Sequence, residues 1–140
     1  VTVPAGVVDE QSKRLIETTK MALECGIEAA KPGNTIGDIG AAISKVVSKS
    51  GFTLTENLVG HGVGYKVHED PFVPNFGIAG KGEKLVPGLI IALEPMVNVG
   101  KASNKILSDG YTIVTRDGSR SAHFEHTIAI TGKGNIILTQ

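Results

Sequence analysis

The stretch Leu89-Ile90-Ile91-Ala92-Leu93-Glu94-Pro95-Met96-Val97 places one carboxylate inside a run of apolar residues. Apolar residues on both sides of Glu94 predict a β-strand over 89–98 that is buried on both faces. A buried, unpaired carboxylate is strongly destabilising, so Glu94 in such a strand calls for a compensating cation. The alternative is an edge strand that leaves Glu94 in water.

A second carboxylate and an imidazole occur in comparable settings. In a strand over 121–131, Glu125 and His123 would point to the same face. The segment Gly60-His61-Gly62-Val63-Gly64 holds a histidine between glycines, which lets backbone and ligand approach closely. One imidazole and two carboxylates from separate strands predict a site for a hard or borderline metal ion. A surface strand and a structural histidine in a turn are the alternatives.

His68 follows seven residues after His61, in Val67-His68-Glu69-Asp70-Pro71. At that distance it could face the same cavity and carry a proton or stabilise a developing oxyanion. An exposed histidine beside a solvated acidic turn explains the same residues. Two glutamates alone would also suit a glycosidase, but that interpretation leaves both histidines without a role.

Size and composition narrow the class of protein. The 140 residues are enough to bury a core, and we expect one domain over 1–140. The chain carries 14 basic and 14 acidic residues and no basic block, which argues against nucleic-acid binding. Its apolar runs are too short to cross a bilayer, and no signal peptide is visible. The single cysteine, Cys25, rules out an internal disulfide and suits a reducing, cytoplasmic compartment.

Periodicity divides the chain into helices and strands. Apolar residues at helical spacing predict helices over 9–30 and from Thr35 to Gly51, with Asp38 placed for a capping box. Asp70-Pro71 is expected in a loop. Helices followed by strands predict an α+β domain with the helices packed on an antiparallel sheet. The expected strands are 52–58, 60–68, 89–98, 111–116, 121–131 and 135–139.

Four segments, in order and with matching spacing, resemble the type I methionine aminopeptidases of the pita-bread metallopeptidase family. The first is Gly-His-Gly-Val-Gly-Tyr-Lys-Val-His-Glu-Asp-Pro at 60–71, and the second is Glu94-Pro95-Met96-Val97-Asn98. Asp109-Gly110-Tyr111-Thr112 and the segment 121–127 complete the set. The resemblance implies the C-terminal half of a pita-bread (creatinase/aminopeptidase-like) fold, with two helices on a curved antiparallel sheet.

The resemblance also implies an activity and a set of ligands. Members remove the N-terminal methionine of peptides and nascent proteins with divalent cobalt, manganese, iron or zinc, two ions in the intact site. It implies that His61, Glu94 and Glu125 are metal ligands, with Glu125 bridging the ions and Glu94 also moving a proton. His68 would contact the substrate, and Val67 and Tyr111 would help to line the methionine pocket.

One departure from the family limits these expectations. Its first two metal ligands are aspartates on an earlier hairpin, and neither Asp9 nor Asp109 is a credible replacement. His123 stands where many members carry glutamine. We therefore expect one ion or none here, and activity only with the missing N-terminal segment. The alternative is a catalytically inactive module that binds one metal or a peptide or protein partner. Exposure of a sheet edge would favour association with that segment or self-association.

Overall fold

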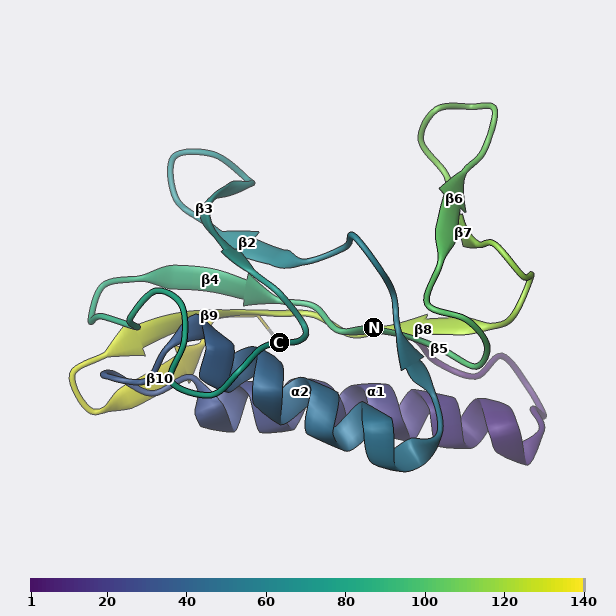
Figure 1. Cartoon of the computed structure of the whole chain (residues 1–140), viewed down its shortest axis with the longest axis horizontal. Helices are drawn as coiled ribbons and strands as arrows, with labels where there is room; N and C mark the ends of the chain where they lie inside the picture. The colour runs from purple at the N-terminus through teal and green to yellow at the C-terminus, as the bar shows by residue number, and fades with distance from the viewer. Residues whose placement is uncertain (140) are drawn as a thin grey trace.

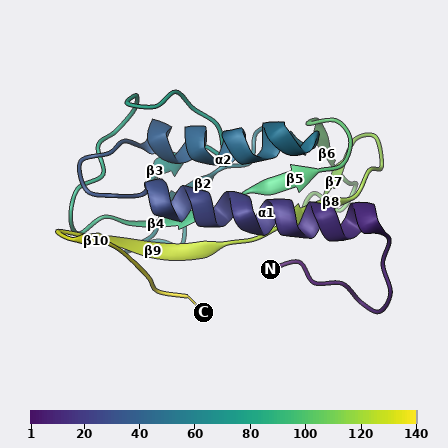
Figure 2. The same ribbon diagram turned by 90° about the horizontal axis from the view of Figure 1, so that it is seen from below.

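The computed structural model describes residues 1–139, in which two helices cover one side of a layer of strands (Figures 1 and 2). Helix α1 spans Glu10–Ala29 and helix α2 spans Ile36–Ser50. Figure 2 shows them side by side and running in opposite directions, and in Figure 1 both lie beneath the strands. Neither helix is long and apolar enough to cross a membrane.

Local capping explains why the helices begin and end where the sequence predicts. The Asp9 side chain accepts a hydrogen bond from the Ser12 backbone N–H at 2.8 Å, at the start of α1. At the start of α2, the Asp38 carboxylate accepts from the Thr35 N–H at 2.8 Å and from its hydroxyl at 2.7 Å. Gly51 ends α2 in the left-handed conformation, at φ 80°. The two predicted helices are thus confirmed to within one residue at each end.

The strands form three groups, and every pairing is antiparallel. A five-stranded sheet has the order β10-β9-β4-β2-β3, a three-stranded sheet the order β1-β5-β8, and β6 pairs with β7. The predicted α+β architecture is therefore confirmed. The strands are β1 Thr53–Leu54, β2 Gly60–Gly62, β3 Glu69–Val73, β4 Ile90–Leu93, β5 Met96–Asn98, β6 Asn104–Ile106, β7 Ile113–Thr115, β8 Ser121–His123, β9 His126–Thr131 and β10 Gly134–Ile137.

The two long strands predicted at 89–98 and 121–131 are each interrupted. The first splits into β4 and β5 at Glu94-Pro95, and the second splits into β8 and β9 at Phe124-Glu125. Pro95 has no N–H to donate, so the hydrogen-bond ladder cannot continue through it. The Phe124 N–H donates to the Pro95 carbonyl at 3.4 Å, so the two segments stay together across the break.

Other predicted strands differ in extent. The strand expected at 60–68 ends at Gly62, because the chain turns back and Gly62 pairs with Glu69. Asp70-Pro71, expected in a loop, lies in β3 at the edge of the sheet, where a proline is tolerated. Strand β6 was not predicted, since Asn-Lys-Ile lacks an alternating pattern and is set by pairing with β7. The strands expected at 52–58, 111–116 and 135–139 shorten to β1, β7 and β10.

The core lies between the helices and the five-stranded sheet. Ile39 and Ile43 of α2 are fully buried, as are Ile91 and Ile128 of the sheet. A Cβ added at Gly26 of α1 would meet Ile43 and Leu93 side chains, so this glycine lets α1 approach both α2 and the sheet. The helix side of the sheet is thereby filled with apolar side chains, and functional groups are left to the other side.

Candidate metal centre

Glu94 and Glu125 stand opposite each other where the two strands are interrupted. Leu93 pairs with His126 on one side of the break, and Met96 pairs with His123 on the other. Both breaks are two residues long, so the pairing register is the same on either side of them. This register places Glu94 opposite Glu125. Like charges directly opposite on neighbouring strands repel each other. The pairing therefore creates a site that a cation would stabilise.

His61 approaches Glu94 from the neighbouring strand. It pairs with Ala92, two residues before Glu94, so both side chains lie on one face of the sheet. His61 is 7% exposed, and its Nε2 lies 3.5 Å from Glu94 Oε1. Its Nδ1 lies 2.9 Å from the Gly62 carbonyl oxygen, which can only accept, so Nδ1 carries the proton. In the neutral ring Nε2 then presents a lone pair, as a metal ligand must.

The glycines on either side of His61 are required by close backbone contacts. A Cβ at Gly60 would overlap the Ala92 carbonyl oxygen, and one at Gly62 would overlap the Asp70 carbonyl oxygen. Strand β2 is thus held between β3 and β4 at a distance that admits no side chain at either position. The expected close approach of backbone at these glycines is confirmed, and the approach of a ligand stays a prediction.

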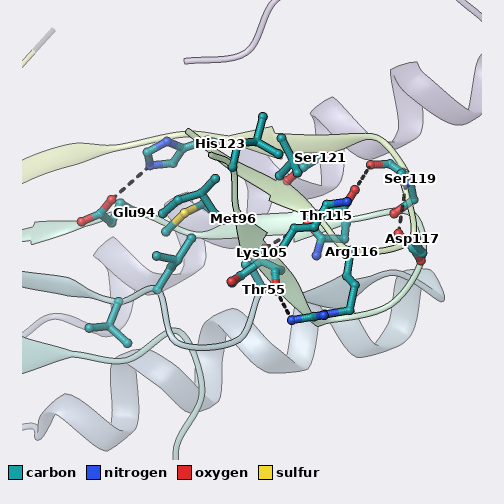
Figure 3. Close-up of a pocket in the computed structure, with 18 of the residues that line it drawn as sticks. Thr55, Glu94, Met96, Lys105, Thr115, Arg116, Asp117, Ser119, Ser121 and His123 are labelled. Atoms are coloured by element: carbon teal, nitrogen blue, oxygen red, sulfur yellow. Dashed lines mark hydrogen bonds and ion pairs between the residues drawn. The ribbon is translucent and has the colours of Figure 1, made fainter. Parts of the chain in front are cut away.

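A second imidazole, that of His123, points toward Glu94, as Figure 3 shows. Its Nε2 lies 3.3 Å from Glu94 Oε2. Although the His123 side chain is 44% exposed, Nε2 itself is buried, and it has no hydrogen-bond partner among the described residues. The 3.3 Å distance and the lack of a hydrogen bond are consistent if Nε2 is close to the carboxylate but the angle is unsuitable for a hydrogen bond. One donor atom each of Glu94, His123 and Glu125 lies within 4.8 Å of the others.

The two carboxylates differ in exposure. The Glu94 side chain is 15% exposed, whereas Glu125 is exposed. Glu125 was expected inside a strand over 121–131, but it lies in the break between β8 and β9, where its side chain is exposed. Its position opposite Glu94 still brings it to the same small cavity of about 300 Å³, with His61, Val67 and His68.

His68 and Val67 lie beside this cavity, but Tyr111 does not. The rings of His68 and His61 meet edge to face, with centroids 4.2 Å apart. Both His68 and Val67 are exposed, Val67 at 74%. Tyr111 is 88% exposed in the turn between β6 and β7, and it lines neither cavity beside Glu94. Thus the structure brings together five of the six predicted site residues.

A larger cavity of about 1080 Å³ opens from the same carboxylate toward the β6–β7 hairpin. Glu94, His61, His68 and His123 lie on its wall. Asp117 lies on the wall too, and hydrogen bonds from the Lys101 and Ser119 N–H groups and the Ser119 hydroxyl lower its pKa to about 2. The apolar part of this cavity's wall could receive a hydrophobic side chain, and it is formed by Leu58, Val59, Met96, Leu107 and Ile113.

Asn75 supports the centre and has no clear signal in the sequence. It is 2% exposed, and its Nδ2 donates to the carbonyl oxygens of Glu94 at 3.3 Å and Leu58 at 3.5 Å. Asn75 thereby satisfies a carbonyl that the interrupted ladder leaves without a strand partner. Because Pro74-Asn75 has the composition of an ordinary loop, only the long-range contacts reveal this role.

The residues present fit a divalent cation. His61 Nε2 and Glu94 Oε1 both act as acceptors in the neutral-imidazole state and face each other at 3.5 Å, an arrangement that a cation between them would satisfy. The buried Nε2 of His123 is a further nitrogen without a hydrogen-bond partner in the described chain. Imidazole and carboxylate donors together suit zinc, iron, cobalt and manganese.

Comparison with known proteins agrees with this chemistry. The sequence profile of metallopeptidase family M24 matches residues 1–132. Methionine aminopeptidase 1 of Bacillus subtilis is 46% identical over 139 residues, which are 99% of this chain and 56% of that protein. A crystal structure of methionine aminopeptidase from Thermotoga maritima has a TM-score of 0.94 at 46% identity and covers 97% of this chain and 55% of that one.

A more distant structure shares the fold alone. Prolidase from Pyrococcus furiosus has a TM-score of 0.75 at 23% identity, over 99% of this chain and 35% of that one. These neighbours confirm the pita-bread fold predicted from the sequence motifs. The chain spans about half the length of the curated relatives it matches, 56% and 55% of the first two. By its sequence profile and its fold, the chain belongs to metallopeptidase family M24.

Proposed function

We propose that this chain carries part of the active site of a metal-dependent aminopeptidase that removes N-terminal methionine from peptides and nascent proteins. The observation that carries the proposal is the pair of opposed carboxylates, Glu94 and Glu125, with the His61 Nε2 at 3.5 Å from Glu94. It is supported by 46% identity to a protein named methionine aminopeptidase. Turnover is proposed to need the part of the relatives' length that this chain does not cover.

In this proposal His61, Glu94 and Glu125 hold the metal. When bound, a divalent cation polarises the scissile carbonyl and lowers the pKa of water. His61 suits its role because the Gly62 carbonyl fixes the ring and leaves Nε2 free to bind. Glu125 is exposed, so its side chain would be free to adjust to a bound cation, whereas Glu94 is held on a backbone that Asn75 anchors.

Two further groups handle the proton and the developing charge. Glu94 is mostly buried between two imidazoles, and we assign it the transfer of a proton from the attacking water to the leaving amine. His68 is exposed beside His61, so its ring can donate a hydrogen bond to the carbonyl oxygen of a bound peptide as charge develops there.

The methionine side chain is assigned to the larger cavity. Its apolar wall begins beside Glu94 at Met96 and Leu58, so a side chain placed there leaves the first peptide bond near the carboxylates. Val67 stands at the mouth of the smaller cavity. Tyr111 is not assigned to the pocket, because it lies in the exposed hairpin turn.

The test is hydrolysis of Met-Ala-Ser in the presence of cobalt, manganese or iron. The chain is mixed with the remaining portion of a relative such as the Bacillus subtilis protein, supplied as a separate polypeptide. We expect methionine release that is lost with Glu94→Gln and kept with Glu17→Gln, an exposed glutamate of α1. No release from a complex shown to have formed would contradict the proposal.

A second candidate is a catalytically inactive module that binds one metal ion. The observation that favours it is the meeting of Glu94, His123 and Glu125 donors within this chain alone. Zinc binding by the chain, without methionine release in any complex with the complementary segment, would support this alternative over the peptidase.

A further inference from the structure

His123 has an arrangement that hydrogen bonding within the chain does not explain. Its side chain is 44% exposed, yet the buried part includes Nε2, a polar atom without a hydrogen-bond partner in residues 1–139. If the ring turned outward, Nε2 would be exposed and could form a hydrogen bond with water. Buried polar atoms in proteins normally have a partner, so the inward position points to a ligand for the nitrogen.

The backbone around His123 fixes this position. His123 lies on β8 opposite Met96 and two residues before Glu125, so all three side chains share one face of the sheet. The Thr2 hydroxyl accepts from the His123 N–H at 2.9 Å and donates to its carbonyl at 3.1 Å, which closes the free edge of β8. The imidazole is thus presented to Glu94 from a clamped segment of chain.

We propose that His123 is a metal ligand, and that His123, Glu94 and Glu125 form a divalent-cation site complete within this chain. Zinc binds nitrogen and oxygen donors at about 2.0–2.1 Å, so adjacent tetrahedral ligands lie roughly 3.3 Å apart. His123 Nε2 and Glu94 Oε2 are separated by 3.3 Å. The Glu125 donor lies within 4.8 Å of both, and its exposed side chain can close the remaining distance.

The site adds a second imidazole to the carboxylate at its centre. His61 faces Glu94 Oε1 and His123 faces Glu94 Oε2, so one carboxylate stands between two nitrogen donors. Three protein ligands leave positions open for water or a further donor, as in catalytic zinc sites. The inference deepens the metal-binding part of the proposed function, but it requires no peptide hydrolysis.

The experiment is NMR spectroscopy of the chain with ring-¹⁵N-labelled histidines, recorded without metal and with one equivalent of zinc. We expect the His123 Nε2 resonance to shift on zinc binding and to leave its apo position fully at one equivalent. His126 lies on the opposite face of the strand pair, with its Nδ1 3.1 Å from the Thr139 hydroxyl, and its resonances should stay in place. This measurement detects ligation directly and needs no variant to fold.

Calorimetry with zinc gives the matched comparison. His123→Gln should weaken binding at least about tenfold, whereas His126→Gln should change it less than twofold. Zinc binding with an unmoved His123 Nε2 resonance overturns the proposal, as does an absence of zinc binding by the unmodified chain. Failure of methionine release with a shifted His123 resonance would reject the peptidase function and leave this ligand in place.

Discussion

The two faces of the β4–β9 strand pair share one backbone and carry opposite chemistry. Toward the helices, Ile91, Leu93 and Ile128 are buried to 1% exposure or less. Toward the cavities, Glu94 stands opposite Glu125. Repulsion between these like charges lowers the stability of the metal-free sheet. Because successive side chains of a strand point to opposite faces, a residue that packs in the core is followed directly by one that faces the candidate site. Neighbouring positions should therefore respond differently to substitution.

The largest effect on stability is expected from the helix face. Leu93→Ala should lower the free energy of unfolding by about 2–5 kcal/mol, because it opens a cavity between α1 and the sheet. The measurement is urea unfolding at neutral pH. Zinc affinity of the folded variant should remain within about twofold. A loss of zinc affinity of tenfold or more would show that the faces are not separable.

A substitution in β2 should damage both faces together. Gly62→Ala places a Cβ against the Asp70 carbonyl, so the strand must shift, at a cost of about 1–3 kcal/mol. Because His61 is the preceding residue, zinc binding should weaken as well. Gly132→Ala is the matched control, since nothing lies within 4 Å of its added Cβ and its φ is not in the left-handed region. Equal unfolding curves for the two variants would contradict the close approach of β2 and β3.

On the cavity face, removing one charge should stabilise the metal-free protein. Glu94→Gln relieves the repulsion from Glu125 and should raise the free energy of unfolding by about 0.2–1 kcal/mol in the presence of a chelator. With zinc the order should reverse, because only the unmodified chain gains binding energy. Thermal unfolding of both proteins, once with chelator and once with zinc, measures the sign of the stability difference in each condition. A destabilised Glu94→Gln variant in chelator would argue against a repulsive pair.

The smallest effect should come from the rim of the larger cavity. The folded-state pKa of Asp117 is lowered from 3.8 to about 2 by hydrogen bonds to its carboxylate. Its contribution to stability is therefore complete above pH 3.8 and is lost as the pH falls toward 2. Urea midpoints at pH 5, 3 and 2 should fall less steeply for Asp117→Asn than for the unmodified chain. Parallel pH profiles would show that these hydrogen bonds contribute nothing to folding.

Local sequence signals were sufficient to predict the helices, and they singled out five candidate residues that the fold brings together around one cavity. Asp9, Thr35, Asp38 and Gly51 cap the helices through neighbours in the sequence, so the ends could be predicted. His61 and Glu94 were found because polar groups between glycines or apolar residues are unusual. The position of the His61 side chain beside Glu94 depends on the pairing register of β2 with β4.

Long-range contacts determine what the sequence could not show. The strand break at Pro95 was predictable from its missing N–H, but its alignment with the break at Phe124 depends on pairing across the sheet. Asn75 acts through carbonyls 17 and 19 residues away. The inward Nε2 of His123 depends on β8 being clamped by Thr2, at the other end of the chain.

The most direct test of a metal centre at Glu94 is a calorimetric titration of this chain with zinc, run in parallel with the Glu94→Gln variant. Glu94 lies between both imidazoles and opposite Glu125, so every arrangement of ligands described above includes it. If Glu94 is at the metal centre, the unmodified chain should bind zinc saturably and the variant at least about tenfold more weakly, with folding intact by circular dichroism. Equal affinities, or no binding by the unmodified chain, would contradict a metal centre at this carboxylate.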